Sequence, residues 1–224
     1  LIKILMVCGL VSSPALADDM GIDDPSRNSY YEALQGKNVV FVPVALGFDL
    51  TDGWYAGMKA ELEPLGVNMQ VRDPNWSADA GARAISSLIG EKPDLIVVHN
   101  PDVQTYAKLL KKAEKRDIHV VQINMKSAYS TDAFVGADYI EIGELAGQAI
   151  VDNCGDGTSG EVAIVQGVLT AAASAYQLRG VANVLSKHPS IKIVSNQAAD
   201  WDSSKARTIT ETTLQQNPNL CGII

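Results

Sequence analysis

VVFVPVALGFDLTDGWYAGMKAELEPLGV, residues Val39–Val67, is the stretch that decides the fold class of this 224-residue chain. It opens with a continuous apolar run, Val39–Val44, which is typical of a strand buried on both faces of a sheet. Apolar side chains then recur at helical spacing from Gly53 to Leu65, and Gly66 follows as a helix stop. A strand, a helix and a further strand in this order predict a parallel sheet with helices on its faces.

The same alternation continues towards the C-terminus, which predicts an α/β protein of two lobes, each a parallel sheet flanked by helices. Ala133–Tyr139 lacks a full helix before it and is interpreted as a short strand that crosses between the two sheets, with the boundary near Asp138. The first lobe is therefore expected at 37–138 and the second at 139–224. The further predicted strands are Val67–Val71, Asp94–His99, Ile118–Ile123, Glu161–Gln166 and Ile191–Ser195. The further predicted helices are Ala78–Ile89, Val103–Lys115, Ile140–Val151, Ala171–Leu185 and Ser203–Gln215.

Residues 1–17 have the pattern of a cleavable signal peptide: Lys3, an apolar stretch, and Ala15-Leu16-Ala17 as the cleavage site. A buried first helix or strand is the alternative. Residues 18–36 are expected to form an N-terminal extension, unstructured over its acidic first half. The chain stops at residues 221–224 inside what is interpreted as the opening of a strand, so the second lobe is expected to be incomplete.

Two cysteines, Cys154 and Cys221, remain after the predicted cleavage. In an oxidising compartment such a pair suggests a disulfide. Two unpaired buried thiols, or pairing with a residue outside this sequence, are the alternatives that the sequence leaves open.

Ligands of parallel sheets bind beyond the carboxyl ends of the strands, so the residues at those positions are the candidate site. Planar amides and carboxylates match vicinal hydroxyls, and aromatic rings cover the C–H faces of sugars. Phe48, Asn124 and Trp201 are large or amide-bearing side chains at strand ends and are favoured as ligand contacts, and Asn100 lies at another strand end. Caps or turns are the favoured roles at three other tips, namely Asp52, Asp102 and Thr170.

Composition and spacing argue against several functional classes. The formal net charge of −8 opposes a nucleic-acid surface, which needs clustered Lys and Arg. The three histidines, His99, His119 and His188, lie far apart without the spacing of metal ligands or a catalytic base. No G-x-x-x-x-G-K-[ST] loop is present, and no apolar run beyond the N-terminus is long enough to cross a bilayer. The sequence therefore predicts a protein without catalytic residues, metal or cofactor.

From about Lys37 onwards the chain resembles the type I periplasmic sugar-binding proteins, the ribose- and galactose-binding group that serves ABC importers. The likeness rests on the order and spacing of several segments together. They are the quoted stretch 39–67, KPDLIVVHNPD (92–102), IHVVQINMKS (118–127), VGADY (135–139), EVAIVQG (161–167), YQLRG (176–180) and QAADWDSSKA (197–206).

This resemblance implies roles for individual residues. Phe48 and Asp49 match the first-loop residues that cover and hydrogen-bond the ligand in the family. Asn124 matches an Asp that binds two sugar hydroxyls, and Gln177 matches an Arg at the start of a helix. The aromatic residue that stacks on the sugar ring has its match in Trp201.

The departures from the family pattern concern charge. Met125 stands where ribose binders have an Arg, with Lys126 beside it, and Asn124 and Gln177 replace charged residues. A neutral pocket with an indole wall suits a small sugar or, with slight preference, a linear polyol. Three further ligand contacts of the family and two hinge strands would lie in a C-terminal part outside this sequence, so weak or absent binding is expected for the chain as given.

The resemblance implies a periplasmic substrate-binding protein of an ABC transporter. Such a protein is a monomer that traps its ligand by hinge closure between two lobes and delivers it to a permease in the inner membrane. Ligand capture for chemotaxis or quorum signalling is the alternative. A transcriptional regulator on the same fold would need a basic helix-turn-helix at the N-terminus, where this chain has the pattern of an export signal.

Overall fold

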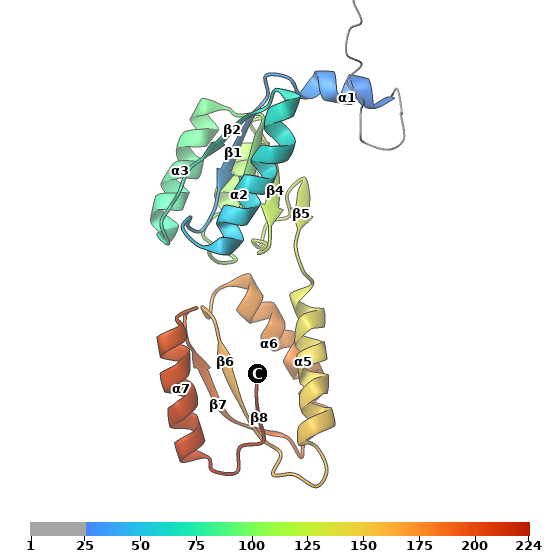
Figure 1. Cartoon of the computed structure of the whole chain (residues 1–224), viewed down its shortest axis with the longest axis vertical. Coiled ribbons are helices and arrows are strands. Elements are labelled where there is room, and N and C mark those ends of the chain that lie inside the picture. Colours follow the sequence, from blue (N-terminus) through green and yellow to red (C-terminus); the bar gives the residue numbers. More distant parts are fainter. Residues whose placement is uncertain (1–25) are drawn as a thin grey trace, which may run out of the picture.

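Two parallel sheets with helices on their faces make up the protein in the computed structural model, which describes residues 26–224. Each sheet forms its own lobe, and the lobes are stacked along the long axis of the molecule (Figure 1). The predicted α/β fold class is confirmed. The expected signal peptide at 1–17, and the first part of the expected extension, lie outside the described residues.

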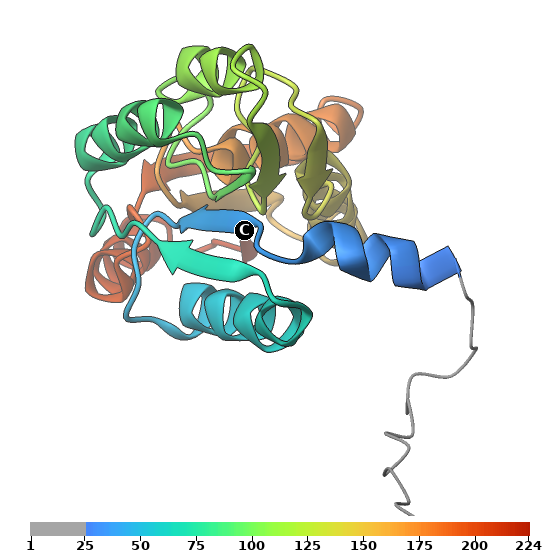
Figure 2. The same ribbon diagram turned by 90° about the horizontal axis from the view of Figure 1, so that it is seen from above.

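The first lobe has a five-stranded sheet in the order β2-β1-β3-β4-β5, with all neighbours parallel. Side chains of β1 alternate: Val39 and Phe41 pack under α2, while Val40 and Val42 pack under α3 and α4. Figure 2 shows α2 on one face of the sheet and α3 and α4 on the other. A strand covered on both faces needs the continuous apolar run that the sequence has here. The elements are α1 (Ser26–Leu34), β1 (Asn38–Val42), α2 (Asp49–Leu62), η1 (Glu63–Leu65), β2 (Asn68–Val71), α3 (Ala78–Glu91), β3 (Leu95–Val98), α4 (Ala107–Glu114), β4 (His119–Ile123) and β5 (Ala133–Val135).

The second lobe has a three-stranded parallel sheet in the order β7-β6-β8. Side chains of α5 and α6 pack on one face of β6, against Val162 and Ile164. Helix α7 lies on the opposite face (Figure 1). The elements are α5 (Tyr139–Cys154), β6 (Glu161–Gln166), α6 (Ala172–Leu185), β7 (Lys192–Ala198), α7 (Ser203–Gln216) and β8 (Gly222–Ile223).

The two lobes repeat one arrangement of elements. In each, a central strand is followed by a helix, a second strand on its flank and a second helix: β1-α2-β2-α3 in the first lobe and β6-α6-β7-α7 in the second. The strand orders β2-β1-β3 and β7-β6-β8 correspond as well. Loops at equivalent positions of the two lobes can therefore be compared directly.

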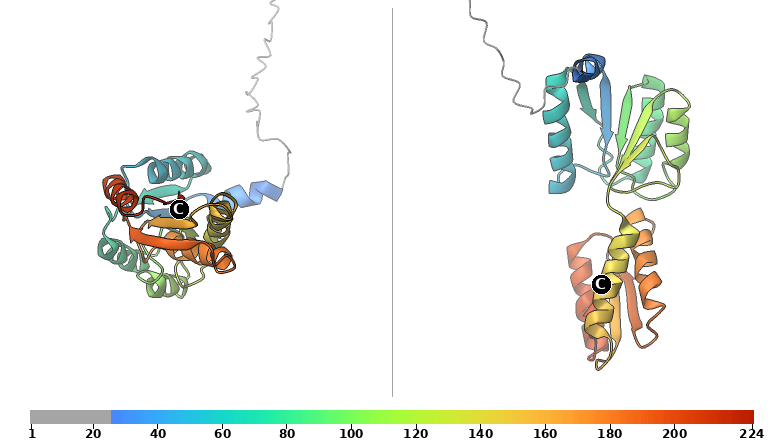
Figure 3. Two further views of the ribbon diagram at one scale, coloured as in Figure 1. Left: turned by 90° about the horizontal axis from the view of Figure 1, so that it is seen from below. Right: turned by 90° about the vertical axis from the view of Figure 1, so that its right-hand side faces the viewer.

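A short linker, residues 136–138, carries the chain from the first sheet to the second within the described residues (Figure 3, right). Asp138 caps α5, because its Oδ1 accepts hydrogen bonds from the backbone N–H groups of Ile140 (2.9 Å) and Glu141 (3.2 Å). The interpretation of 133–139 as a strand crossing between the sheets was right in part, because a strand is present but the crossing itself is the linker that follows it. Ala133–Val135 pairs with β4 as the edge strand of the first sheet, because parallel pairing satisfies its backbone groups there.

Two further elements differ from the sequence-based expectations. Part of the expected N-terminal extension is a helix, α1, and its Leu34 packs against the apolar cluster beneath α2. Helix α4 begins at Ala107 instead of Val103, because Asp102 Oδ1 accepts from the N–H groups of Gln104 and Thr105 at 2.7 Å each and holds a turn there.

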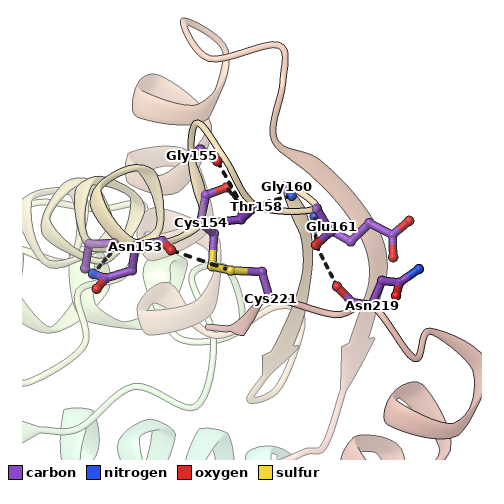
Figure 4. The surroundings of a disulfide bond; sticks show 10 residues. Asn153, Cys154, Gly155, Thr158, Gly160, Glu161, Asn219 and Cys221 are labelled. Carbon is purple, nitrogen blue, oxygen red and sulfur yellow. Dashed lines mark hydrogen bonds between the residues drawn. A yellow bond between two sulfur atoms is a disulfide. The ribbon is translucent and has the colours of Figure 1, made fainter.

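A disulfide joins Cys154, the last residue of α5, to Cys221, the residue before β8, with the two Cα atoms 5.7 Å apart (Figure 4). The N–H of Cys221 donates to the carbonyl of Glu161 at 2.8 Å, so the start of β8 is fixed to the sheet as well. Cys154 is buried in the second-lobe core. The disulfide therefore ties the helical face of this lobe to its short edge strand.

Helices α5 and α6 are in close contact through glycine. A Cβ atom at Gly180 would lie 2.0 Å from the carbonyl oxygen of Ile140, and one at Gly143 would lie 2.0 Å from that of Gln177. Both positions are helical with ordinary backbone angles, so space is the reason for glycine here. The close approach sets the position of α6, which carries several residues of the candidate site.

Candidate ligand-binding site

The carboxyl ends of the strands in the two lobes face each other. Side chains from both sets of tips meet in one apolar group, which we call the interlobe cluster. The N–H of Val103 also donates to the carbonyl of Thr170 in the other lobe at 3.3 Å. The buried members of the interlobe cluster are Val44, Met125, Ala171, Ala172 and Ala173, and its partly buried members are Phe48, Val103, Tyr139, Val168 and Tyr176.

The interlobe cluster corrects the expectation of an open gap between the lobes. The sequence predicts polar and aromatic residues on either side of an open gap, and the tips do face each other. The protein's own apolar side chains fill part of the space between them. Met125, where the resemblance implies a charged residue in ribose binders, is one of these buried side chains. A guest held between the lobes has to bind beside the cluster or displace part of it.

Phe48 forms the aromatic wall of the first lobe together with Trp76. The two rings stack with centroids 5.2 Å apart and an interplanar angle of 25°. Asp73 Oδ1 accepts from the N–H of Leu46 (3.2 Å) and of Asn75 (2.8 Å), which ties the loop before Phe48 to the loop that carries Trp76. Asp49 is exposed at the first position of α2.

Asn124 lies at the end of β4 with a positive φ of 59°, and its side chain links the two lobes. Its Oδ1 accepts from the hydroxyl of Tyr139, the first residue of α5, at 2.7 Å. Its Nδ2 is 3.2 Å from Nε2 of His99. One lone pair on Oδ1 and one N–H on Nδ2 remain, so the amide can still bind a hydroxyl group.

His99 is 2% exposed, and burial lowers the pKa of its imidazole to about 4. The ring is therefore neutral at pH 7, and the hydrogen bond with Asn124 Nδ2 makes its Nε2 the acceptor and places the proton on Nδ1. Its edge-to-face neighbour is Trp54 of α2, with centroids 5.3 Å apart. Protonation would turn Nε2 into a donor and remove the acceptor that orients Asn124.

His99 should make the first lobe sensitive to acid. The unfolded chain binds a proton at His99 near pH 6.5, whereas the folded protein resists it down to about pH 4, so stability falls as the pH drops through this interval. Between pH 7 and pH 5 the loss should be about 2 kcal/mol. Urea unfolding at the two pH values should show this loss in the unmodified protein and a smaller one in His99→Gln. The variant His119→Gln changes an exposed histidine and retains His99, so it should keep the full loss. An equal loss of unfolding free energy between pH 7 and pH 5 in all three proteins would contradict the prediction.

Of two other predicted site residues, one is buried and the other is exposed. Asn100 is fully buried, and its Nδ2 donates to Gln122 Oε1 (2.9 Å) and to the carbonyl of Met125 (2.8 Å), so it supports the loop that follows β4. Its Oδ1 has no hydrogen-bond partner among the described residues. Lys126 is exposed, and its Nζ lies 4.9 Å from the ring centroid of Phe134.

In the second lobe a cavity of about 120 Å³ brings Gln177 and Trp201 together. Its floor is apolar, made by side chains of β6 and α6 and by Ile224, which follows β8. Trp201 is packed against the backbone at Gly167, where a Cβ atom would lie 2.4 Å from the indole ring. The lining residues are Ile164, Val165, Gln166, Gly167, Ser174, Gln177, Leu178, Val181, Trp201 and Ile224.

The cavity contains polar groups that the sequence reasoning missed. Ser174 Oγ and Gln166 Oε1 are buried without a hydrogen-bond partner among the described residues, and both residues line the cavity. A buried polar atom without a partner costs free energy, which a ligand hydroxyl would recover. The signal for Gln166 was available, because it ends a predicted strand. Ser174 gave no such signal, because it lies in the first turn of a helix and not at a strand end.

Trp76 was also missed. The sequence reasoning considered the ends of the other strands but not the loop after β2, where this residue lies. The signal that could have identified it is the recurrence of an Asx-Trp pair before a helix cap, in Asn75-Trp76-Ser77 and Asp200-Trp201-Asp202.

The site is chemically neutral. An indole, carboxamides and a hydroxyl surround the cavity, and no ionisable side chain lines it. In residues 26–224 no three His, Cys, Asp or Glu side chains lie close enough together to hold a metal ion. None of the helices in that range is both long and apolar enough to cross a membrane. The arrangement is suited to an uncharged guest with hydroxyl groups and an apolar face.

Comparison with known proteins agrees with this chemistry. Residues 39–224 match the family model of the periplasmic binding protein domain. The galactofuranose-binding protein of Escherichia coli is 25% identical over 204 residues, which is 85% of this chain and 63% of that protein. The D-allose-binding periplasmic protein of the same organism is 33% identical over 120 residues, which is 50% of this chain and 38% of that protein.

Solved structures show the same fold. A solute-binding protein of an ABC transporter from Burkholderia graminis, in complex with D-arabinose, superposes with a TM-score of 0.77 at 26% identity. The match covers 85% of this chain and 65% of that one. The present chain thus spans less than two thirds of the length of these relatives. By comparison with the two-lobed structures its second lobe is incomplete, in agreement with the prediction.

Proposed function

Because the chain belongs to the periplasmic binding protein domain family, we propose that it captures a small sugar or polyol in the periplasm for import by an ABC transporter. It binds this ligand without transforming it. The relatives named above bind D-allose and galactofuranose, and the solved one holds D-arabinose. The protein would deliver its ligand to a permease in the inner membrane.

The observation that best supports this proposal is the cavity beside Trp201. Sugars and polyols present C–H faces to aromatic rings and vicinal hydroxyls to amides. The cavity offers an indole wall, the amides of Gln166 and Gln177 and the unpaired hydroxyl of Ser174. The absence of a charged lining residue disfavours organic acids and amino acids, whose charges would be left unpaired.

Capture would proceed by movement of one lobe against the other. The lobes are joined by the linker 136–138 in the described chain and meet through the interlobe cluster and the Tyr139–Asn124 hydrogen bond. In our proposal, a ligand seated on Trp201 and Gln177 receives further hydrogen bonds from Asn124 when Phe48 closes over it. Binding energy then favours the closed form because only that form provides both walls.

Trp201→Asn tests the proposal. Trp201 has a φ of 64°, and Asn tolerates this left-handed conformation, so the variant removes the ring and leaves the backbone as it is. The protein expressed from its complete reading frame would be titrated calorimetrically with D-allose, D-ribose, D-arabinose and xylitol. At least one should bind, and loss of the stacked indole should weaken that binding up to about tenfold.

Tyr30→Ala is the matched control, because Tyr30 is an exposed aromatic residue on α1 outside the candidate site, and it should leave affinity unchanged. Acids and amino acids would be titrated alongside. Binding of acids or amino acids only, with no binding of any sugar or polyol, would refute the proposed function.

A further inference from the structure

The loops that carry Trp76 and Trp201 share a pair of successive residues with positive φ. Asn75 and Trp76 have φ values of 48° and 65°, and Asp200 and Trp201 have 55° and 64°. Each pair is followed by a helix cap of the same kind: Ser77 Oγ accepts from the N–H of Ala80 (3.2 Å), and Asp202 Oδ1 accepts from that of Lys205 (2.8 Å). The loops follow the equivalent strands β2 and β7.

A left-handed conformation suits Asn and Asp but is unfavourable for tryptophan. Among the seven non-glycine residues with positive φ in the described chain, these two are the aromatic ones. Such costs persist where the surrounding structure enforces them, and they concentrate at sites that clamp ligands. In the first lobe the constraint is visible: the N–H of Trp76 donates to the carbonyl of Val44 at 2.9 Å.

Both indoles are open to a guest on one side. Trp76 is 60% exposed and Trp201 is 53% exposed, although each rests on a neighbour, Phe48 or the backbone at Gly167. Helices α3 and α7, which begin just after the two residues, lie on the same side of the molecule (Figure 1). Their N-terminal ends point to the space between the lobes, because each follows a strand whose carboxyl end faces the other lobe.

We propose that Trp76 is a second ligand-contacting ring, and that together with Trp201 it selects sugars that carry a further apolar-faced group, namely glycosides, over free monosaccharides. This inference rests on the proposed function. Phe48 lies inside, in the interlobe cluster, while Trp76 continues the aromatic wall outwards on its exposed side. In this proposal, a single sugar ring stacked on Trp201 leaves the exposed face of Trp76 uncovered. A second ring attached to that sugar would cover it.

The experiment compares Trp76→Asn and Trp76→Phe with the unmodified protein. Asn keeps the left-handed backbone and removes the ring, whereas Phe keeps an aromatic face. D-allose, D-ribose and D-galactose would each be titrated as free sugars and as their methyl and phenyl β-glycosides. For the unmodified protein we expect the phenyl glycoside to bind about tenfold more tightly than the free sugar, from one additional stacked ring.

Trp76→Asn should bring the ratio of the phenyl-glycoside affinity to the free-sugar affinity close to one, because it weakens binding of the glycoside far more than binding of the free sugar, and Trp76→Phe should restore most of the ratio. If Trp76 merely supports Phe48, the Asn variant will weaken binding of the free sugar and of the glycoside equally. The ratio of the two affinities will then not change, which overturns the inference. Equal affinities for the phenyl glycoside and the free sugar in the unmodified protein also overturn the inference, while the proposed function stands. If no free sugar and no glycoside binds the unmodified protein, the proposed function itself fails for these sugars.

Discussion

Replacing both Cys154 and Cys221 with Ala is expected to lower the free energy of unfolding of the second lobe by about 4 kcal/mol. The disulfide closes a loop over a sequence separation of 67 residues, and the unfolded chain without it gains the corresponding freedom. The folded lobe loses support at the same time. β8 is only two residues long, and the disulfide anchors its start to α5.

Urea unfolding followed by tryptophan fluorescence measures this effect, since Trp201 reports on the second lobe and Trp54 on the first. The second-lobe transition should move to lower urea, whereas the first-lobe transition should stay in place. A reducing agent should reproduce the shift in the unmodified protein and have no effect on the double variant. A loss below about 1 kcal/mol would show that the disulfide constrains the chain much less than its loop length implies.

Gly180→Ala should destabilise the second lobe by about 3 kcal/mol, at the upper end of what overpacking costs. The new Cβ would lie 2.0 Å from the carbonyl oxygen of Ile140 and 2.9 Å from the Cα of Gly143. Both are backbone atoms of α5, so no side chain can rotate away and the two helices must separate. Because α6 carries Ser174 and Gln177, ligand binding should weaken as well.

Gly57→Ala is the matched control. Gly57 lies inside helix α2 and is exposed, and a Cβ atom added there would meet nothing within 4 Å. Alanine at this position should stabilise the first lobe by about 0.5–1 kcal/mol through helix propensity alone. Thermal unfolding of the three proteins compares them directly. A Gly180→Ala protein as stable as the unmodified one would mean that α5 and α6 can move apart at little cost.

The order of strands and helices could be predicted from the sequence because each element carries its own periodicity. Val39–Val44 is apolar throughout since β1 is covered on both faces, and β6 was predicted with its observed ends. The fate of Ala133–Val135 could not be predicted in the same way. Three residues are too few for a pattern, and their place in the first sheet depends on pairing with β4, which is a tertiary contact.

The candidate site was predictable where a residue type has one evident role at a strand tip, as for Trp201, which lines the cavity. Gln177 lines the same cavity but lies within α6, and only the family resemblance indicated it. The site was less predictable where burial decides whether a side chain can reach a ligand. Asn100 and Met125 follow strands as predicted, yet Asn100 is fully buried and Met125 belongs to the interlobe cluster. Whether a tip side chain points into the protein depends on the opposite lobe, and no local pattern encodes that.

The short linker at 136–138 has a consequence for how this protein could acquire new ligands. Substantial packing between helices and strands occurs within one lobe or the other, so each half of the site is supported by its own sheet. A loop graft at 75–77 or at 200–202 would exchange one aromatic wall and leave the opposite scaffold intact. The two walls can thus diverge one at a time, as separate modules of a single recognition surface.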